Sequence, residues 1–416
     1  MAILKVQVEV EELEHGMFVC ELDRPWTDTT FLLQGVLIES GEDMAEFRRK
    51  CEYVFIDVER SRDSIRPKLQ QLAGKNNTLE IAQPEKMTAE LAEQEQLKFQ
   101  QELKVARKLH KKTRSYVEQL LDDVRLGNSL DTDTARELVG EITSSVARSP
   151  NAMLWLSHMK SRDEYTTTHC MNVCILAVTF GRTLNLDENQ LELLGLGALL
   201  HDIGKMRVPL DILNKPGALT DEEFEIIKTH PVSGYNMLRQ KEDMPAEVLD
   251  IVKFHHERIN GRGYPDGLQG DFINLLTQIT SVVDVYDAIT SDRCYHDGIP
   301  PYDALKDMYA WSGENFDANL VEQFIKCLGI YPIGSMVELN TGHIGVVVSA
   351  SEKARLRPII LLIKDKQGQR YNVPKLINLA HPHWSQKENL MEVRHIVNDK
   401  ESDINLAEVV ASEAVL

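Results

Sequence analysis

Side chains that commonly bind metal ions recur between residues 169 and 284, spaced some 25 to 32 residues apart. They form two adjacent pairs and three single positions: His169, His201, Asp202, His230, His255, His256 and Asp284. Neutral imidazole and carboxylate suit Fe, Mn, Zn and similar divalent ions, and one carboxylate can bridge two ions through its two oxygens. Seven such groups exceed what one ion needs, so the pattern predicts a pair of metals.

Two metals about 3.5–4 Å apart can clamp a phosphodiester, polarise it and activate a water between them. This chemistry fits the charge of the chain, which has 46 Lys+Arg, 65 Asp+Glu and a formal net charge of −19 over 416 residues. An anionic substrate would need local positive charge, which metals supply. The same net charge argues against non-specific binding to a nucleic acid polymer or to an anionic membrane surface.

Helices must bring the seven groups together, because each single position or pair falls in a different predicted helix or at its end. Between about residues 130 and 330, apolar-periodic segments follow Ser, Thr or Asp and end near Gly or Pro, which is typical of capped helices. A helical bundle can direct side chains from several helices to one interior point. The sequence therefore predicts an all-α catalytic domain.

Composition divides the rest of the chain into further segments, so the predicted fold class is multi-domain α+β. The predicted parts are a β-rich N-terminal regulatory domain (1–62), a linker (63–86), a long amphipathic helix (87–130), the helical catalytic domain (131–332), a β-rich C-terminal extension (333–385) and a polar tail (386–416). The long helix either packs on its own domain or serves as a dimerisation or relay helix.

The six cysteines include no CxxC pair, which favours reduced thiols over disulfides or a zinc site. The N-terminus lacks a basic stretch followed by an apolar one, so no signal peptide is expected. The longest apolar runs fall short of the roughly 20 residues that span a bilayer. We therefore expect a cytoplasmic protein with no membrane insertion.

Three segments of the helical region carry the motifs of one family. They are LLHDIGKMRVPLDILNKPGALTDEEFEIIKTHPVSGYNML, FHHERINGRGYPDGLQGDFI and ITSVVDVYDAITSDRCY. In this order, over roughly residues 160–330, they resemble the HD-GYP subgroup of the HD-superfamily phosphohydrolases, which hydrolyse bacterial cyclic dinucleotides. The resemblance implies a helical HD-type bundle and a metal-dependent phosphodiesterase that acts on cyclic di-GMP.

The resemblance also implies roles for individual residues. The seven metal-binding side chains would hold two divalent ions, with Fe or Mn favoured, and Asp202 would bridge them. Asp202 and Lys205 would be catalytic, because the Lys205 ammonium can hold a phosphate oxygen or assist the leaving group. Further substrate contacts are expected at Arg262, Gly263, Tyr264, Pro265 and Arg293. Asp287 would orient metal ligands, or else cap its helix or form a salt bridge.

Three features depart from the family pattern. Ile259 and Asn260 stand where the family commonly has Trp and Asp, which bears on base recognition or on loop packing. Cys294 and His296 replace the usual proline and lysine, which bears on the wall of the substrate site. Tyr165 stands where some members have a glutamate that helps to hold a third metal, so two metals are favoured over three.

Partners and alternatives complete the expectations. The stretch HGMFVCELDRPW resembles a domain often found ahead of HD-GYP domains. The resemblance to the HD-GYP family suggests a diguanylate cyclase domain as a partner, because the loop of Gly263, Tyr264 and Pro265 is linked to such contacts in that family. The long helix makes a homodimer reasonable. The alternatives are hydrolysis of 3′,3′-cyclic GMP-AMP, a non-catalytic nucleotide-binding or cyclase-interacting scaffold, and a phosphohydrolase acting on mononucleotides. The complete ligand set disfavours the scaffold, and the GYP loop disfavours the mononucleotide enzyme. The expected product is a linear dinucleotide, with a second cut to GMP if that product rebinds.

Overall fold

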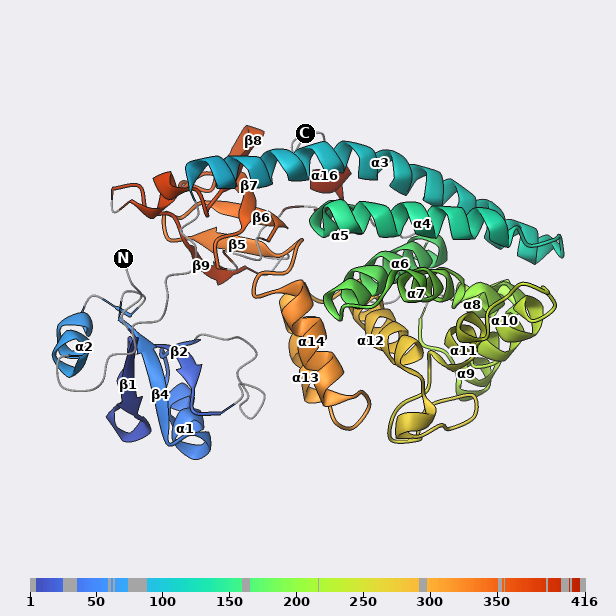
Figure 1. The fold of residues 1–416 in the computed structure, drawn as a ribbon, viewed down its shortest axis with the longest axis horizontal. Coiled ribbons are helices and arrows are strands. Elements are labelled where there is room, and N and C mark those ends of the chain that lie inside the picture. Colours follow the sequence, from blue (N-terminus) through green and yellow to red (C-terminus); the bar gives the residue numbers. More distant parts are fainter. Residues whose placement is uncertain are drawn as a thin grey trace. The chain divides into compact units, whose positions relative to one another are not determined.

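The computed structural model describes residues 5–24, 36–58, 61–62, 64–73, 88–158, 165–215, 217–291, 298–350, 354, 356–386, 388–397, 404 and 406–411. The chain divides into two compact units, Met1–Lys86 and Met87–Leu416 (Figure 1). Among the described residues, no helix is long and apolar enough to cross a membrane. Mixed helices and sheets confirm the predicted α+β class.

The first unit contains a four-stranded antiparallel sheet. Its strands are β1 (Lys5–Glu9), β2 (Phe18–Leu22), β3 (Val36–Leu37) and β4 (Tyr53–Asp57), in the spatial order β1-β4-β2-β3. Val6 and Val8 of β1 are buried, whereas Gln7 and Glu9, which alternate with them, are exposed. This alternation is the pattern from which strands were predicted here.

Two helices in the first unit differ from the sequence prediction, which had only strands over 1–62 and a linker over 63–86. The first, α1 (Gly41–Lys50), begins with a capping box between Ser40 and Asp43 and buries Phe47. The second, α2 (Arg66–Ala73), adds Leu69 to the core of the sheet. Each helix is short and carries only a few apolar residues, so its helical periodicity is too brief to distinguish it from the surrounding segments.

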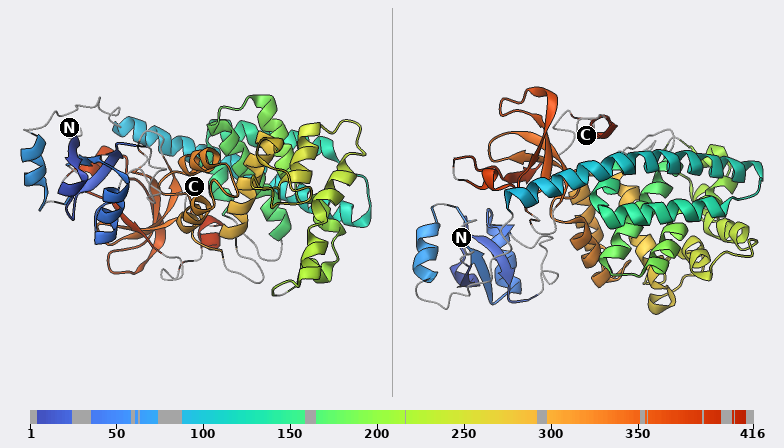
Figure 2. Two further views of the ribbon diagram at one scale, coloured as in Figure 1. Left: turned by 90° about the horizontal axis from the view of Figure 1, so that it is seen from below. Right: turned by 45° about the horizontal axis from the view of Figure 1, so that its top comes forward.

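The second unit begins with α3 (Ala89–Leu126), which lies side by side with α4 (Thr132–Arg148) in Figures 1 and 2. The Thr88 side chain caps the first turn, and Gly127 ends the helix with a left-handed φ of +79°. Buried residues such as Leu103 and Ala106 form its inner face. The helix therefore packs on its own unit, which is one of the two predicted alternatives.

Shorter helices complete the helical part of this unit and carry the candidate site. They are α5 (Pro150–Leu156), α6 (Tyr165–Thr183), α7 (Glu188–Leu200), α8 (Leu210–Leu213), α9 (Asp221–Ile227), α10 (His230–Leu238), α11 (Ala246–Phe254), α12 (Leu275–Thr290), α13 (Pro301–Ala310) and α14 (Ala318–Leu328). A 3₁₀ helix, η3 (Ile203–Arg207), follows α7. The extensive contacts of α6 with α7 and α12 form the centre of this bundle.

The chain ends in an antiparallel five-stranded sheet in the spatial order β8-β7-β6-β5-β9. Its strands are β5 (Met336–Leu339), β6 (Ile344–Ser349), β7 (Ile359–Lys364), β8 (Arg370–Asn378) and β9 (Val393–Ile396), and a short helix, α16 (Leu406–Ala411), follows. Strand β9 lies in the segment expected to be a polar tail, yet it pairs with β5. Only Val393 and Ile396 of this strand pack on the sheet core, too few to give a strand pattern.

We expect buried His110 of α3 to lower the free energy of unfolding in mild acid. Burial, reinforced by Arg114 and Arg107, lowers its pKa to about 4, and its Nε2 has no hydrogen-bond partner among the described residues. An unfolded histidine titrates near pH 6.5, so between pH 6.5 and 4 the unfolded chain gains a proton that the folded chain does not. The contribution of His110 to the free energy of unfolding should be fully present above this pH window and be lost as the pH falls through it.

Replacing His110 with leucine should therefore reduce the loss of unfolding free energy between pH 7.5 and pH 5 by about 2 kcal/mol. Urea unfolding followed by circular dichroism measures this difference, and the comparison with the parent chain cancels the contributions of other groups. The same replacement at exposed His383 controls for the loss of a histidine. Equal pH dependence in the His110→Leu variant and the parent would contradict the prediction.

Candidate metal centre

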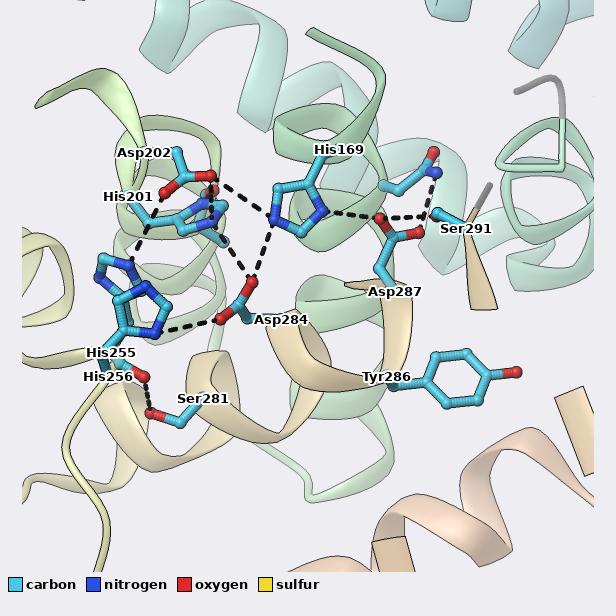
Figure 3. A network of polar contacts seen from close by, with 12 residues as sticks. His169, His201, Asp202, His255, His256, Ser281, Asp284, Tyr286, Asp287 and Ser291 are labelled. Atoms are coloured by element: carbon cyan, nitrogen blue, oxygen red, sulfur yellow. Dashed lines mark hydrogen bonds and ion pairs between the residues drawn. The ribbon is translucent and has the colours of Figure 1, made fainter. Parts of the chain in front are cut away.

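The structure brings the seven predicted metal-binding side chains to one interior point, and each single position or pair comes from a different helix or its end. Figure 3 labels all of these side chains except His230. His169 lies in α6, His201 and Asp202 follow α7, His230 begins α10, His255 and His256 follow α11, and Asp284 lies in α12. Their ligand atoms form two groups, and within each group all of these atoms lie within 4.8 Å of one another. One group is Asp202, His230, His255 and His256, and the other is His169, His201 and Asp284.

Asp202 lies between the two groups. Its Oδ1 is 3.2 Å from Nε2 of His230 and 3.8 Å from Nε2 of His255. Its Oδ2 is 3.4 Å from Nε2 of His201 and 3.6 Å from Nε2 of His169. The two oxygens of one carboxylate thus face different sets of imidazoles, which is the geometry required of a bridging ligand.

Hydrogen bonds on the far side of the rings leave bare nitrogens facing the carboxylates. Three Nδ1 atoms contact backbone carbonyls three residues earlier: His201 with Ala198 at 2.7 Å, His230 with Ile227 at 2.7 Å and His255 with Val252 at 3.0 Å. When Nδ1 donates, Nε2 of a neutral ring carries a lone pair. In the described part of the chain, Nε2 of His201 and Oδ1 of Asp202 are buried without hydrogen-bond partners. Lone pairs facing carboxylate oxygens repel unless a cation lies between them, so this donor set fits metal ions.

The Nδ1 atom of His169 contacts the carboxylate of Asp287. Its Nδ1 lies 2.7 Å from Oδ2 of Asp287, and its Nε2 lies 3.0 Å from Oδ1 of Asp284. Asn172 donates to the other oxygen of Asp287 at 3.0 Å, and the Ser291 hydroxyl donates to Oδ2 at 3.3 Å. Of the roles considered for Asp287, these contacts favour orientation of a ligand.

The electrostatics of the cluster keep its carboxylates ionised. Burial alone would raise the pKa of Asp202, but Lys205 and the imidazoles outweigh burial and hold the pKa well below its usual range. Asp284 behaves in the same way, through His169 and its neighbours. Burial would lower the pKa of His169, yet its bonds to Asp284 and Asp287 raise it to about 9. His169 and these carboxylates therefore stabilise one another's charged forms.

The other shifted histidines are held neutral. Burial is the main cause that lowers the pKa of three of them: His201, His255 and His256. Neutral imidazole and ionised carboxylate are the forms that bind metal ions. The cluster thus holds these histidines and both of its carboxylates in metal-binding form.

The predicted substrate residues divide into those at the cluster and those away from it. The Lys205 ammonium contacts Asp202, and the ring centroid of Tyr264 lies 4.7 Å from that of His256. Arg262 lies apart, with a side chain that is 81% exposed and an ion pair with Glu314 at 3.5 Å. Gly263 packs directly on the segment after α11, where a Cβ atom would lie 2.4 Å from Cα of Glu257. Pro265 follows Tyr264 through a cis peptide bond.

Several positions singled out in the sequence lie outside the described residues, namely Arg293, Cys294 and His296. The side chain of Tyr165 also lies outside them. Asn260 is described, and its side chain accepts a hydrogen bond from the Arg262 N–H at 2.9 Å and donates to Asn315 at 3.1 Å. This departure from the family pattern thus takes part in loop packing.

The sequence interpretation missed three residues beside the cluster. Asn172 holds Asp287, and the Lys228 ammonium lies 5.5 Å from the ring centroid of Tyr264. Glu257 is 2% exposed and accepts hydrogen bonds from the loop that contains Tyr264. Its place directly after the two histidines of FHHERI was the one available signal.

Comparison with known families and proteins agrees with this architecture. Family models match residues 151–320 as an HD domain, residues 5–135 as a domain of unknown function and residues 336–383 as a KOW domain associated with HD domains. A Pseudomonas aeruginosa protein named cyclic di-GMP phosphodiesterase is 39% identical over 354 residues, covering 85% of this chain and 83% of that protein.

Two further relatives match smaller parts of the chain. A cyclic di-GMP phosphodiesterase response regulator of Xanthomonas campestris is 36% identical over 40% of this chain and 44% of its own length. The 3′3′-cGAMP-specific phosphodiesterase 2 of Vibrio cholerae is 30% identical over 47% of this chain and 35% of its own length. Together with the likeness to the P. aeruginosa protein over most of both sequences, these matches show that the chain belongs to the HD-GYP family of cyclic-dinucleotide phosphodiesterases within the HD superfamily.

Proposed function

We propose that the chain hydrolyses cyclic di-GMP with a pair of divalent metal ions held by the two ligand groups. The observation that carries this proposal is Asp202, whose two oxygens face histidines on both sides. The substrate is supported by the P. aeruginosa relative, whose name is cyclic di-GMP phosphodiesterase and which matches over most of both chains. Five imidazoles with two carboxylates suit Fe or Mn.

When bound, such a metal pair neutralises charge on a phosphodiester and lowers the pKa of water. The residues of the chain direct this chemistry. The His256 side chain is 17% exposed, more than any other of the seven, so the substrate approaches from its side. Lys205 is 18% exposed and brings its ammonium to Asp202, where it can hold a phosphate oxygen or stabilise the departing 3′-oxygen. One cleavage gives a linear dinucleotide, and a second gives GMP.

A side-by-side hydrolysis assay tests the proposal. The full-length chain, purified anaerobically and supplied with Mn(II) or Fe(II), would be offered cyclic di-GMP and 3′,3′-cyclic GMP-AMP, with products separated by chromatography. We expect faster cleavage of cyclic di-GMP. Faster cleavage of 3′,3′-cyclic GMP-AMP would instead favour the other substrate class found among the relatives. A chain that binds two metals but cleaves neither would refute the phosphodiesterase and favour the scaffold.

Three further expectations stay predictions from the sequence. They are contact with a diguanylate cyclase domain, a homodimer and a cytoplasmic location. In the structure the buried face of α3 packs on its own unit, so a dimer formed through this helix would use exposed residues such as Leu97 and Val105.

A further inference from the structure

Glu257 connects the ligand pair after α11 to the loop that follows it. Its side chain is buried, and it accepts hydrogen bonds from three consecutive backbone N–H groups of that loop. Oε1 receives them from Asp266 at 2.7 Å and Gly267 at 3.0 Å, and Oε2 receives one from Leu268 at 3.0 Å. A carboxylate that accepts several backbone N–H groups forms charge-assisted bonds that fix a loop firmly.

The loop thus fixed is packed against the ligand pair itself. Gly263 lies so close that a Cβ atom would be 2.4 Å from Cα of Glu257 and 2.6 Å from the carbonyl oxygen of His256. The N–H of Tyr264 donates to that same carbonyl at 3.3 Å. As a result the ring of Tyr264 lies over the imidazole of His256, with centroids 4.7 Å apart and planes inclined by 33°.

His256 differs from the other four histidines of the cluster in what orients its ring. Each of the others makes a hydrogen bond through Nδ1, either to a backbone carbonyl or to Asp287. His256 instead presents Nδ1 to Asp284, at 3.7 Å, and the described residues give its ring no hydrogen bond to a carbonyl or carboxylate outside the cluster. Its ring is held by packing, between His255 on one side and Tyr264 on another.

From these contacts we infer that Glu257 is a positioning residue that sets the affinity of the His256 group for its metal, acting through the loop and the ring of Tyr264. The inference rests on the proposed dinuclear centre. Residues that orient metal ligands typically change metal affinity by 10- to 100-fold when they are replaced. Here the group that orients the ligand His256 is the aromatic ring of Tyr264. Glu257, which fixes the loop that carries this ring, directly follows His256 in the sequence.

Mn(II) binding to the full-length chain, measured by calorimetry with electron paramagnetic resonance and without substrate, tests the inference. The variants are Glu257→Gln, Tyr264→Leu and the double variant. Glu102→Gln is the matched control, because Glu102 is also buried and hydrogen-bonded, to Ser145 and Arg148, but lies in α3 away from the loop. We expect one of the two Mn(II) sites, that of the His256 group, to lose about tenfold in affinity in each loop variant. The control should keep the parent affinities.

The double variant separates positioning from a general loss of stability. If Glu257 acts through Tyr264, adding Glu257→Gln to Tyr264→Leu should weaken Mn(II) binding no further, even where the melting temperature falls again. Parent-like Mn(II) affinity in Glu257→Gln, or losses that add in the double variant, would overturn the inference and leave the dinuclear centre intact. A parent chain that binds a single Mn(II) would overturn the dinuclear centre and the inference together.

Discussion

Replacing Asp202 with asparagine is expected to lower the turnover of cyclic di-GMP by at least about 1000-fold. The reason is the position of this one carboxylate, whose oxygens lie 3.2 Å from Nε2 of His230 and 3.4 Å from Nε2 of His201. An asparagine keeps the shape but has one oxygen and no charge, so it cannot bridge two cations. Its amide would instead donate a hydrogen bond to a bare imidazole nitrogen and hold the cluster in a metal-free form.

Three measurements on the Asp202→Asn variant check this expectation: the rate of product formation, the metal content per chain and the melting temperature. Metal content should fall from two ions to one or fewer, while the melting temperature without metal stays at or above that of the parent. Asp250→Asn provides the control, because Asp250 is hydrogen-bonded by Asn274 and takes no part in the cluster. Turnover within tenfold of the parent with two metals bound would rule out a bridging Asp202.

The candidate ligands could be predicted because their residue types bind metals and their spacing places about one ligand position in each helix and loop. Each histidine or aspartate sits in or at the end of a helix, as His201 does at the end of α7, whose capping box at Asp187 and Gln190 is visible in the sequence. The family motifs then assigned the seven residues together. Which oxygen of Asp202 faces which imidazole could not be predicted, because that depends on how five elements pack.

The residues that the sequence left unassigned act through the backbone or through a single side chain. Glu257 binds three N–H groups of the loop, a contact that depends on the path of the main chain and has no sequence pattern. Asn172 lies one turn after His169, and the sequence does not distinguish it from other polar helix residues. Its role depends on a hydrogen bond to Asp287 of α12, which only the packing of the two helices reveals. Strand β9 and helix α1 were missed for a similar reason: the other strands of its sheet supply most of the apolar surface for β9, and the sheet it packs on supplies it for α1.

Asp287 is the second position where replacing one carboxylate oxygen with an amide nitrogen should strongly affect metal binding. Replacing it with asparagine is expected to weaken metal binding at the His169 group by about 10- to 100-fold, with a similar loss of turnover at limiting metal. The carboxylate accepts from His169 on Oδ2 and from Asn172 on Oδ1, so both of its oxygens are acceptors. An amide has only one acceptor, and its NH₂ group must therefore face a donor, either the His169 ring or the Asn172 amide.

Ser291→Ala is the matched control for this prediction, because its hydroxyl donates to the same Oδ2 at 3.3 Å and its loss leaves both acceptor oxygens in place. Mn(II) titration of the two variants should give a large loss for Asp287→Asn and less than about a threefold change for Ser291→Ala. Equal losses in both would mean that the whole hydrogen-bonded group, and not the carboxylate itself, orients His169. No loss in Asp287→Asn would mean that packing within α6 alone fixes the ring, in which case Asp287 would not be needed to orient this ligand.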